Sequence, residues 1–314
     1  MPEATSRHDE VVTTVGNTRR APSTGDLALS ATVITWACAF PAIRVGLVGY
    51  SPWALGLLRL GFASITLAAL ATIVRIKVPP RAAWPRVVLA GLLGQTLYQG
   101  LLMTGELTVP AGTASILIAT APLFSVAAAA VVLGESMRGR WTGMVVAFAG
   151  TVLVGASLGL GASSAGLFVL AAAVCQGLYH VVVKPLAESV GALSATAWSV
   201  WAGSAMALVG LPALRNDFAT APTSSLWAAI FLGVVPSALG YLAWSAAVSR
   251  TTIARSTSAL YLVPVVALIL AWLWLGERPS PLAVVGGALA VLGVIMARRH
   301  PGTATEPVPP HPAV

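Results

Sequence analysis

Residues 121–135 read APLFSVAAAAVVLGE, and residues 263–277 read VPVVALILAWLWLGE. Both stretches have proline in second position, continue as an almost wholly apolar run and end in Leu-Gly-Glu. They lie 142 residues apart (122 to 264), and the same spacing relates Gly91 to Gly233. With an offset of 143, one residue longer, Gly143 and Gly150 match Gly286 and Gly293. A repeat of this length predicts that the chain consists of two similar halves.

The composition places both halves in a membrane. Of the 314 residues, 57% are hydrophobic and 9% are charged, and the mean hydropathy is +0.86. A soluble domain carries about 25% charged residues, so the composition excludes a water-soluble enzyme. About 20 apolar residues cross a bilayer as a helix. The sequence contains ten such stretches, at 27–48, 53–74, 86–105, 111–133, 140–158, 164–183, 193–214, 226–247, 255–275 and 280–297.

The basic residues predict the orientation of these spans. If the N-terminus lies inside and the chain alternates, 14 of the 18 Lys and Arg fall on the cytoplasmic side, as the positive-inside rule requires. The other four are Arg44, Arg59, Arg215 and Arg278. Because each half has an odd number of spans, five, the second half enters the membrane upside down. We therefore predict an all-α membrane protein of ten transmembrane helices, built as two inverted five-helix repeats at 27–158 and 164–297. The segments 1–26 and 298–314 are predicted to be disordered cytoplasmic tails.

This organisation resembles the EamA family, the ten-helix branch of the drug/metabolite transporter superfamily. The resemblance rests on the order of several features: Trp36 and Phe40 in the first span, Ser51-Pro52 leading to Arg59 in the second, and a Pro and a closing Gly-Glu in the fourth and ninth. It covers about 27–297. Members export amino acids and other small metabolites or drugs across the cell membrane. Both of their chain ends are cytoplasmic. The resemblance implies this fold and activity, and it does not name a substrate.

A solute path needs polar groups that face the interior of the bundle. Gln95, Tyr98 and Gln99 lie at i, i+3 and i+4 on one helix face, and Gln176, Tyr179 and His180 repeat that spacing. Aromatic rings beside neutral hydrogen-bonding groups form a pocket for a zwitterionic or amphipathic solute. The alternative is that these side chains only pair helices. The candidate binding residues are Trp36, Phe40, Gln95, Tyr98, Gln99, Ser115, Gln176, Tyr179, His180, Ser237, Tyr241, Trp244, Ser258 and Tyr261.

Charged residues and prolines within spans are further candidates. Arg59 is costly in a membrane helix and either binds a solute carboxylate or braces the helix by reaching outward. His180 and Glu106 are candidates for proton coupling, and facilitated diffusion is the other open mode. Pro122 and Pro264 each remove a backbone donor, which predicts either a gate or a fixed bend. Glu135 and Glu277, beside Arg138 and Arg278, are predicted to form helix-end ion pairs.

Several chemistries lack their sequence signals. No GxxxxGK[ST] loop is present, so we expect no direct use of ATP. The basic residues do not cluster as nucleic-acid binding requires. Cys38 and Cys175 show no metal-binding spacing, and we expect no metal or cofactor. The sequence favours a secondary transporter, an exporter of a small organic metabolite that works by alternating access. The rival classes are a membrane sensor or scaffold and a lipid-modifying enzyme.

Overall fold

The computed structural model describes residues 23–133, 141–248, 250 and 259–299, and every regular element within them is a helix. Seven of the described helices are long and apolar enough to cross a membrane, and three shorter apolar helices accompany them. The all-helical membrane architecture is therefore confirmed. The first half contains α1 (Thr24–Gly46), α2 (Pro52–Leu70), α3 (Trp84–Gly91), α4 (Tyr98–Glu106), α5 (Ala111–Ile118), α6 (Ala121–Leu133) and α7 (Trp141–Ser157). The second half contains α8 (Gly159–Val190), α9 (Ala192–Met206), α10 (Leu211–Asp217), α11 (Thr223–Val234), α12 (Gly240–Val248), α14 (Leu262–Leu275) and α15 (Pro281–Arg299).

Two predicted boundaries are wrong. The first helix begins at Thr24, inside the predicted tail, because Ser23 and Asp26 form a capping box in which each side chain accepts a hydrogen bond from the other residue's backbone N–H. The break predicted at 159–163 lies earlier, at Leu158, because α8 already begins at Gly159. The turn between α7 and α8 needs little more than the positive φ of 74° at Gly159.

The prolines of the repeat begin helices and do not bend them. The predicted span 111–133 is divided at Ala119 and Thr120, and Pro122 is the second residue of α6. Pro264 is the third residue of α14. A proline in the first helical turn removes an N–H that has no intrahelical acceptor there, so it costs little. Neither proline lies in the middle of a helix, and Pro122 comes just after the turn at Ala119 and Thr120 that interrupts the span Ala111–Val131.

Each half contains a π-helical segment at the same place. The segment η2 (Leu92–Leu97) joins α3 to α4, and η4 (Val235–Leu239) joins α11 to α12. Their last residues are 142 positions apart (97 to 239), which is the spacing of the repeat. π-Helical turns are rare and gather at functional sites, because they displace side chains and free backbone groups from the regular ladder.

The two halves pack through equivalent atoms. A Cβ at Gly91 would lie 2.7 Å from the backbone N of Gly203 and 2.9 Å from the carbonyl O of Ser199 on α9. A Cβ at Gly233 would lie 2.9 Å from the N of Ala63 and 2.6 Å from the carbonyl O of Arg59 on α2. Each third span therefore lies directly on the second span of the other half. Only glycine allows backbones to approach this closely.

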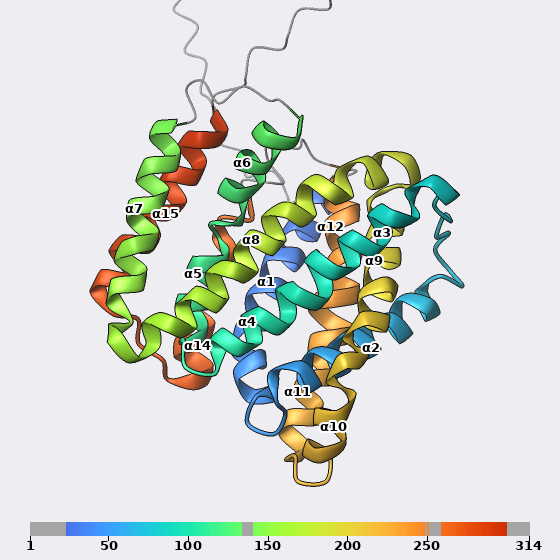
Figure 1. Cartoon of the computed structure of the whole chain (residues 1–314), viewed down its shortest axis with the longest axis horizontal. Coiled ribbons are helices and arrows are strands. Elements are labelled where there is room, and N and C mark those ends of the chain that lie inside the picture. The colour runs from blue at the N-terminus through green and yellow to red at the C-terminus, as the bar shows by residue number, and fades with distance from the viewer. Residues whose placement is uncertain (1–22, 134–140, 249, 251–258, 300–314) are drawn as a thin grey trace, which may run out of the picture.

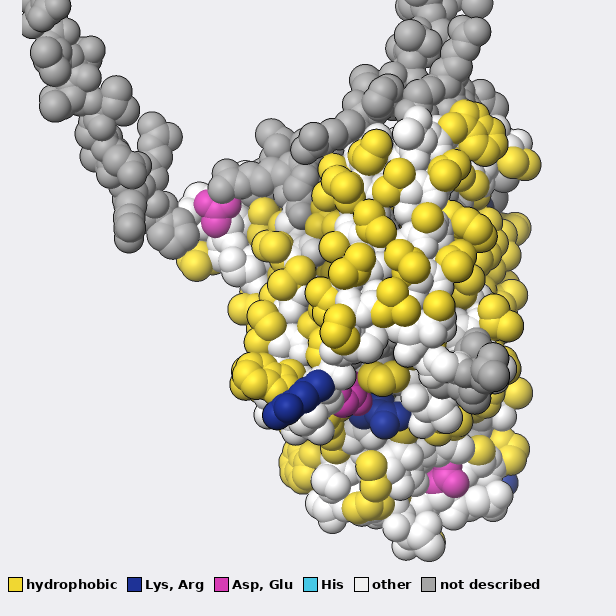
Figure 2. Space-filling model, turned by 90° about the vertical axis from the view of Figure 1, so that its left-hand side faces the viewer, with side chains coloured by type: hydrophobic (Ala, Val, Ile, Leu, Met, Phe, Trp, Pro, Cys, Tyr) yellow, Lys and Arg dark blue, Asp and Glu magenta, His cyan; other side chains and the backbone are white. Residues whose placement is uncertain are grey.

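Helices α7 and α15 form a separate antiparallel pair (Figure 1). Gly143 packs on Ala297 at one end, and Gly150 packs on Ala290 further along, so the two helices run in opposite directions. Their outer faces carry exposed apolar side chains, including Val145, Phe148 and Val285. Figure 2 shows hydrophobic side chains covering this side of the molecule, with charged side chains gathered below them. Such a surface suits contact with lipid.

Candidate functional site

Several of the residues predicted to line a solute path lie around the two π-helical segments. Of these segments, η4 packs against α1 and α2, and η2 packs against α8 and α9. Arg59, 8% exposed, lies on α2 and donates a hydrogen bond from Nε to Ser237 Oγ on η4 at 2.9 Å. Arg59 therefore does not reach outward to the membrane surface. The bond engages Nε and leaves the two terminal nitrogens of the guanidinium group for other partners.

Aromatic rings form one side of this site. Trp36 on α1 donates from Nε1 to the carbonyl O of Pro236 in η4 at 3.1 Å. Its ring centroid lies 5.3 Å from that of Tyr241 and 5.8 Å from that of Trp244, both on α12. The π-helical turn thus leaves the carbonyl O of Pro236 available to accept a hydrogen bond from the indole N–H of Trp36. Phe40, one turn along α1, is buried in the adjoining hydrophobic core.

Two buried amide groups belong to η2 and α4. Gln95 on η2 and Gln99 on α4 are each 2% exposed. The hydroxyl group of Tyr241 lies near the Gln95 side chain. Even so, Gln95 Nε2 and Gln99 Oε1 have no hydrogen-bond partner, and neither has Gln176 Oε1 on α8. Buried amide atoms are nearly always paired in proteins. Unpaired ones at one site indicate a place prepared for a polar ligand.

Tyr179 on α8 closes the site beside η2. Its ring packs against Gly94 so closely that a Cβ there would lie 2.3 Å from the nearest ring atom. Its hydroxyl group lies near the side chains of Thr196 and Ser199 on α9. Neither neighbour was predicted from the sequence, and neither was Thr96, which donates to the carbonyl O of Gly203 at 2.9 Å. The glycine of each third span was the available signal, because it shows where another helix comes close.

Four predicted binding residues lie elsewhere or cannot be placed. His180 is exposed, and its Nδ1 lies 3.1 Å from Ser125 Oγ on α6, so it joins two helices. Ser115 donates to the carbonyl O of Gly112 in its own helix at 2.6 Å. Tyr261 packs on the small cluster around Leu123, Ala147 and Val294, where α6, α7 and α15 meet. Ser258 is outside the described residues.

A charged cluster lies where α1, α4 and α14 end. Arg44 donates from Nη1 to the carbonyl oxygens of Glu106 and Leu107, and its Nε lies 3.4 Å from Glu277 Oε1. Glu277 was predicted to pair with Arg278, and that prediction is wrong because Arg44 approaches it from α1. The other predicted helix-end acid, Glu135, is outside the described residues. Glu106 is completely buried, and neither of its carboxyl oxygens has a hydrogen-bond partner.

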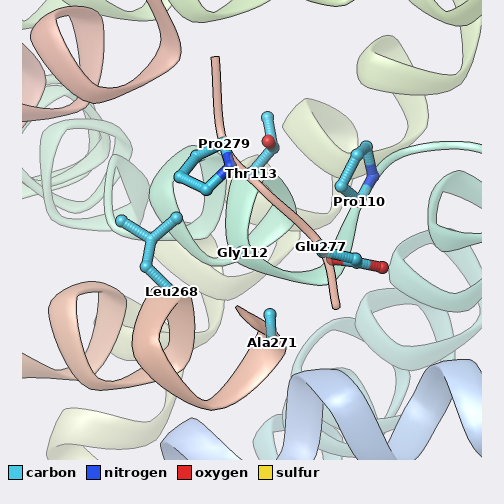
Figure 3. Close-up of a pocket in the computed structure, with 7 residues that line it drawn as sticks. All are labelled: Pro110, Gly112, Thr113, Leu268, Ala271, Glu277 and Pro279. Atoms are coloured by element: carbon cyan, nitrogen blue, oxygen red, sulfur yellow. The ribbon is translucent and has the colours of Figure 1, made fainter. Parts of the chain in front are cut away.

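Two cavities adjoin this charged end. The smaller holds about 10 Å³, room for one water molecule, between Pro110, Thr113 and Glu277 (Figure 3). The larger holds about 240 Å³ and is lined in part by Thr108, Arg278 and Ser280. They share Pro110, Thr113 and Pro279. None of the predicted binding residues lines either cavity. In this conformation the side chains of Arg59, Gln95 and Ser237 are buried.

Comparison with known proteins agrees with this architecture. The model of the EamA-like transporter family matches twice, at residues 23–156 and 163–299. A probable terminal-alkyne amino-acid exporter of Streptantibioticus cattleyicolor is 47% identical over 275 residues, covering 87% of this chain and 93% of the relative. The uncharacterized transporter YdfC of Bacillus subtilis is 34% identical, covering 82% of this chain and 86% of its own. A solved crystal structure aligns with a TM-score of 0.58 at 22% identity, covering 88% and 97% of the two chains, and so shares the fold. The two family matches and the relatives show that this chain belongs to the EamA-like transporter family.

Proposed function

We propose that the protein exports a small amino acid or a related amphipathic metabolite by alternating access at the site between η2 and η4. The main support is the set of buried amide atoms without partners, Gln95 Nε2 and Gln99 Oε1, together with the proximity of Gln95 to Tyr241, whose ring packs on Trp36. Arg59 is the cation of the site and binds the solute carboxylate through its free terminal nitrogens. The rings of Trp36 and Tyr241 hold the apolar part of the solute.

The layout that we propose has ten spans in two inverted halves, with boundaries near 27–158 and 164–297. The seven long helices and the three shorter apolar ones supply the spans. The antiparallel pairing of α7 with α15 supports the inversion, because these helices are the last spans of equivalent halves. The equivalent contacts of Gly91 and Gly233 support a two-fold relation between the halves. Rocking of one half against the other would open the packed centre to either side in turn.

Flux measurements test the site. In vesicles containing the purified protein, we expect the single changes Gln99→Ala, Tyr179→Ala and Tyr241→Ala each to reduce exchange of L-propargylglycine, a terminal-alkyne amino acid, to the level of empty vesicles. Each change removes a hydrogen-bonding or ring contact with the solute, and the amount of folded protein should stay unchanged. Trp227→Ala is the control, since Trp227 is 65% exposed on α11 and lies away from the site. Wild-type flux in all three variants would refute the site.

Labelling tests the orientation, for which we propose cytoplasmic chain ends. Ser51, before α2, is bonded to Asp217 at the end of α10, whereas Lys77, before α3, is bonded to Ser194 at the start of α9. The two contacts mark opposite ends of the bundle. After Cys38 and Cys175 are replaced by alanine, we expect a membrane-impermeant maleimide to label Thr220→Cys on intact cells and Val78→Cys only after lysis. The reverse pattern would invert the topology.

A further inference from the structure

Glu106 has an environment that the central site does not explain. It is the last residue of α4 and is 0% exposed, and both of its carboxyl oxygens are buried without a hydrogen-bond partner. The basic group beside it does not neutralise it. The nitrogens of Arg44 are directed to the carbonyl oxygens of Glu106 and Leu107 and to the carboxylate of Glu277.

An ionised carboxylate is not stable in such a place. Removing a carboxylate from water costs several kcal/mol even after the protein relaxes, and only good ion pairs or hydrogen bonds repay that cost. Within the described part of the chain, the only recorded ion pair is the one between Arg44 and Glu277. The Glu106 carboxyl group is therefore stable in this conformation as the neutral acid, with a proton bound.

The surroundings of Glu106 contain few other ionisable groups. Arg44 faces it from α1, Arg59 from α2, and Glu277 from the segment after α14. Helix α5 has no ionisable residue, and α8 meets this end of α4 through Ala165 and Val169, which lie against Gly105. Within α4 and η2, the ionisable neighbour of this region is Tyr98. The single unpaired acid of this group is Glu106.

A proton fits this site better than a metal ion does. Hard metal ions take six or more oxygen ligands, and the described residues contain no group of three or more His, Cys, Asp or Glu that could hold a metal. The guanidinium group of Arg44 also repels a second cation. A carboxyl group alone is a sufficient ligand for a proton.

Two cavities lie near the charged cluster beside this acid. The cavity of about 240 Å³ beside Thr108 and Arg278 shares three lining residues with the one-water cavity at Glu277. Glu277 is linked to the backbone of Glu106 through Arg44. Arg44 and Glu277 thus connect the smaller cavity to the buried acid.

We propose that Glu106 is the proton-binding site of this transporter, and that its carboxylate takes up one proton for each solute exported. The inference rests on the proposed transport function. Protonation converts the carboxylate to the neutral acid, which can be buried as the structure shows. Loss of the proton requires this end of the bundle to open to water. Binding and release of the proton are thereby tied to the conformational change.

The test separates protonation from transport. Infrared spectra of the purified protein should show a carboxylic-acid C=O stretching band at neutral pH. We expect this band to vanish in Glu106→Gln, to shift but persist in Glu106→Asp, and to be unchanged in Glu188→Gln, which removes an exposed acid of α8. A band that survives Glu106→Gln would overturn the proposal.

Flux in vesicles provides the second readout. We expect a pH gradient to drive L-propargylglycine uphill in the wild type and in Glu188→Gln, and to fail in Glu106→Gln, which should still exchange solute for solute. Exchange by the wild type that ignores the pH gradient would overturn the proposal and leave the transport function standing. If Glu106→Gln also loses solute exchange, the carboxylate binds the amine of the solute and not a coupling proton, which would overturn the proposal. A wild type that exchanges no amino acid would refute the proposed function, while the infrared band would still report whether Glu106 holds a proton.

Discussion

Replacement of Gly143 by valine is expected to prevent α7 and α15 from pairing and to remove most of the yield of folded protein. A Cβ at Gly143 would lie 2.2 Å from the backbone N of Ala297 and 2.6 Å from the carbonyl O of Gly293. Neither atom can move without moving α15. Overpacking of this kind costs about 1–3 kcal/mol, and clashes with backbone belong at the upper end of that range. The measurement is the apparent Tm and the yield of monodisperse protein in detergent.

Gly155 provides a matched control on the same helix. Nothing lies within 4 Å of a Cβ placed there, so Gly155→Val makes the same chemical change in open space. We expect this variant to keep the Tm and yield of the wild type. Gly293→Val should reproduce the defect of Gly143→Val, because a Cβ at Gly293 meets the N of Ala147 at 2.2 Å. Equal behaviour of the Gly143 and Gly155 variants would show that the close pairing of α7 with α15 does not exist in the membrane.

The glycine pairs show why much of this fold can be predicted from sequence. Gly143 and Gly150 match Gly286 and Gly293 at an offset of 143, one residue more than the repeat spacing, and each of the four lies in a close helix contact. Hydropathy predicts the spans for a similar reason. Both a close helix contact and a membrane span depend on the size or polarity of single residues, which the sequence states directly. The ends of helices were harder to predict. The beginning of α1 depends on the mutual bonds of Ser23 and Asp26, and apolar counting does not detect them.

The site was predicted less completely, because its geometry depends on long-range contacts. Periodicity placed Gln95 and Gln99 on one face, but no pattern predicted the π-helical segments that aim them. The partner of Arg59 is Ser237, 178 residues away, and that of Glu277 is Arg44. A charge that is adjacent in sequence, such as Arg278 beside Glu277, gives a wrong prediction of the ion pair when the fold brings another partner, here Arg44 of α1. For His180, helical spacing alone could not distinguish an inward face from the exposed face on which it lies.

Replacement of Arg59 by glutamine is expected to weaken binding of solutes that carry a carboxylate. A hydrogen bond to a charged group is worth about 1.5–3 kcal/mol, which corresponds to a loss of about 10- to 100-fold in affinity. Glutamine keeps a polar group near Ser237 Oγ, which now accepts from Arg59 Nε at 2.9 Å, so the fold should survive. The measurement is the concentration of L-propargylglycine that gives half-maximal exchange in vesicles.

An uncharged analogue distinguishes solute binding from bracing of the helix. L-Propargylglycinamide has the same side chain and amine but no carboxylate, so Arg59→Gln should change its half-maximal concentration little. Ser237→Ala keeps the cation and removes only its partner, and we expect a smaller loss for the amino acid than Arg59→Gln causes. An equal loss for both solutes in Arg59→Gln would mean that Arg59 holds α2 against η4 and does not contact the solute. The two readings differ because a bracing residue acts on every solute alike, whereas a counter-ion acts only on the charge that it binds.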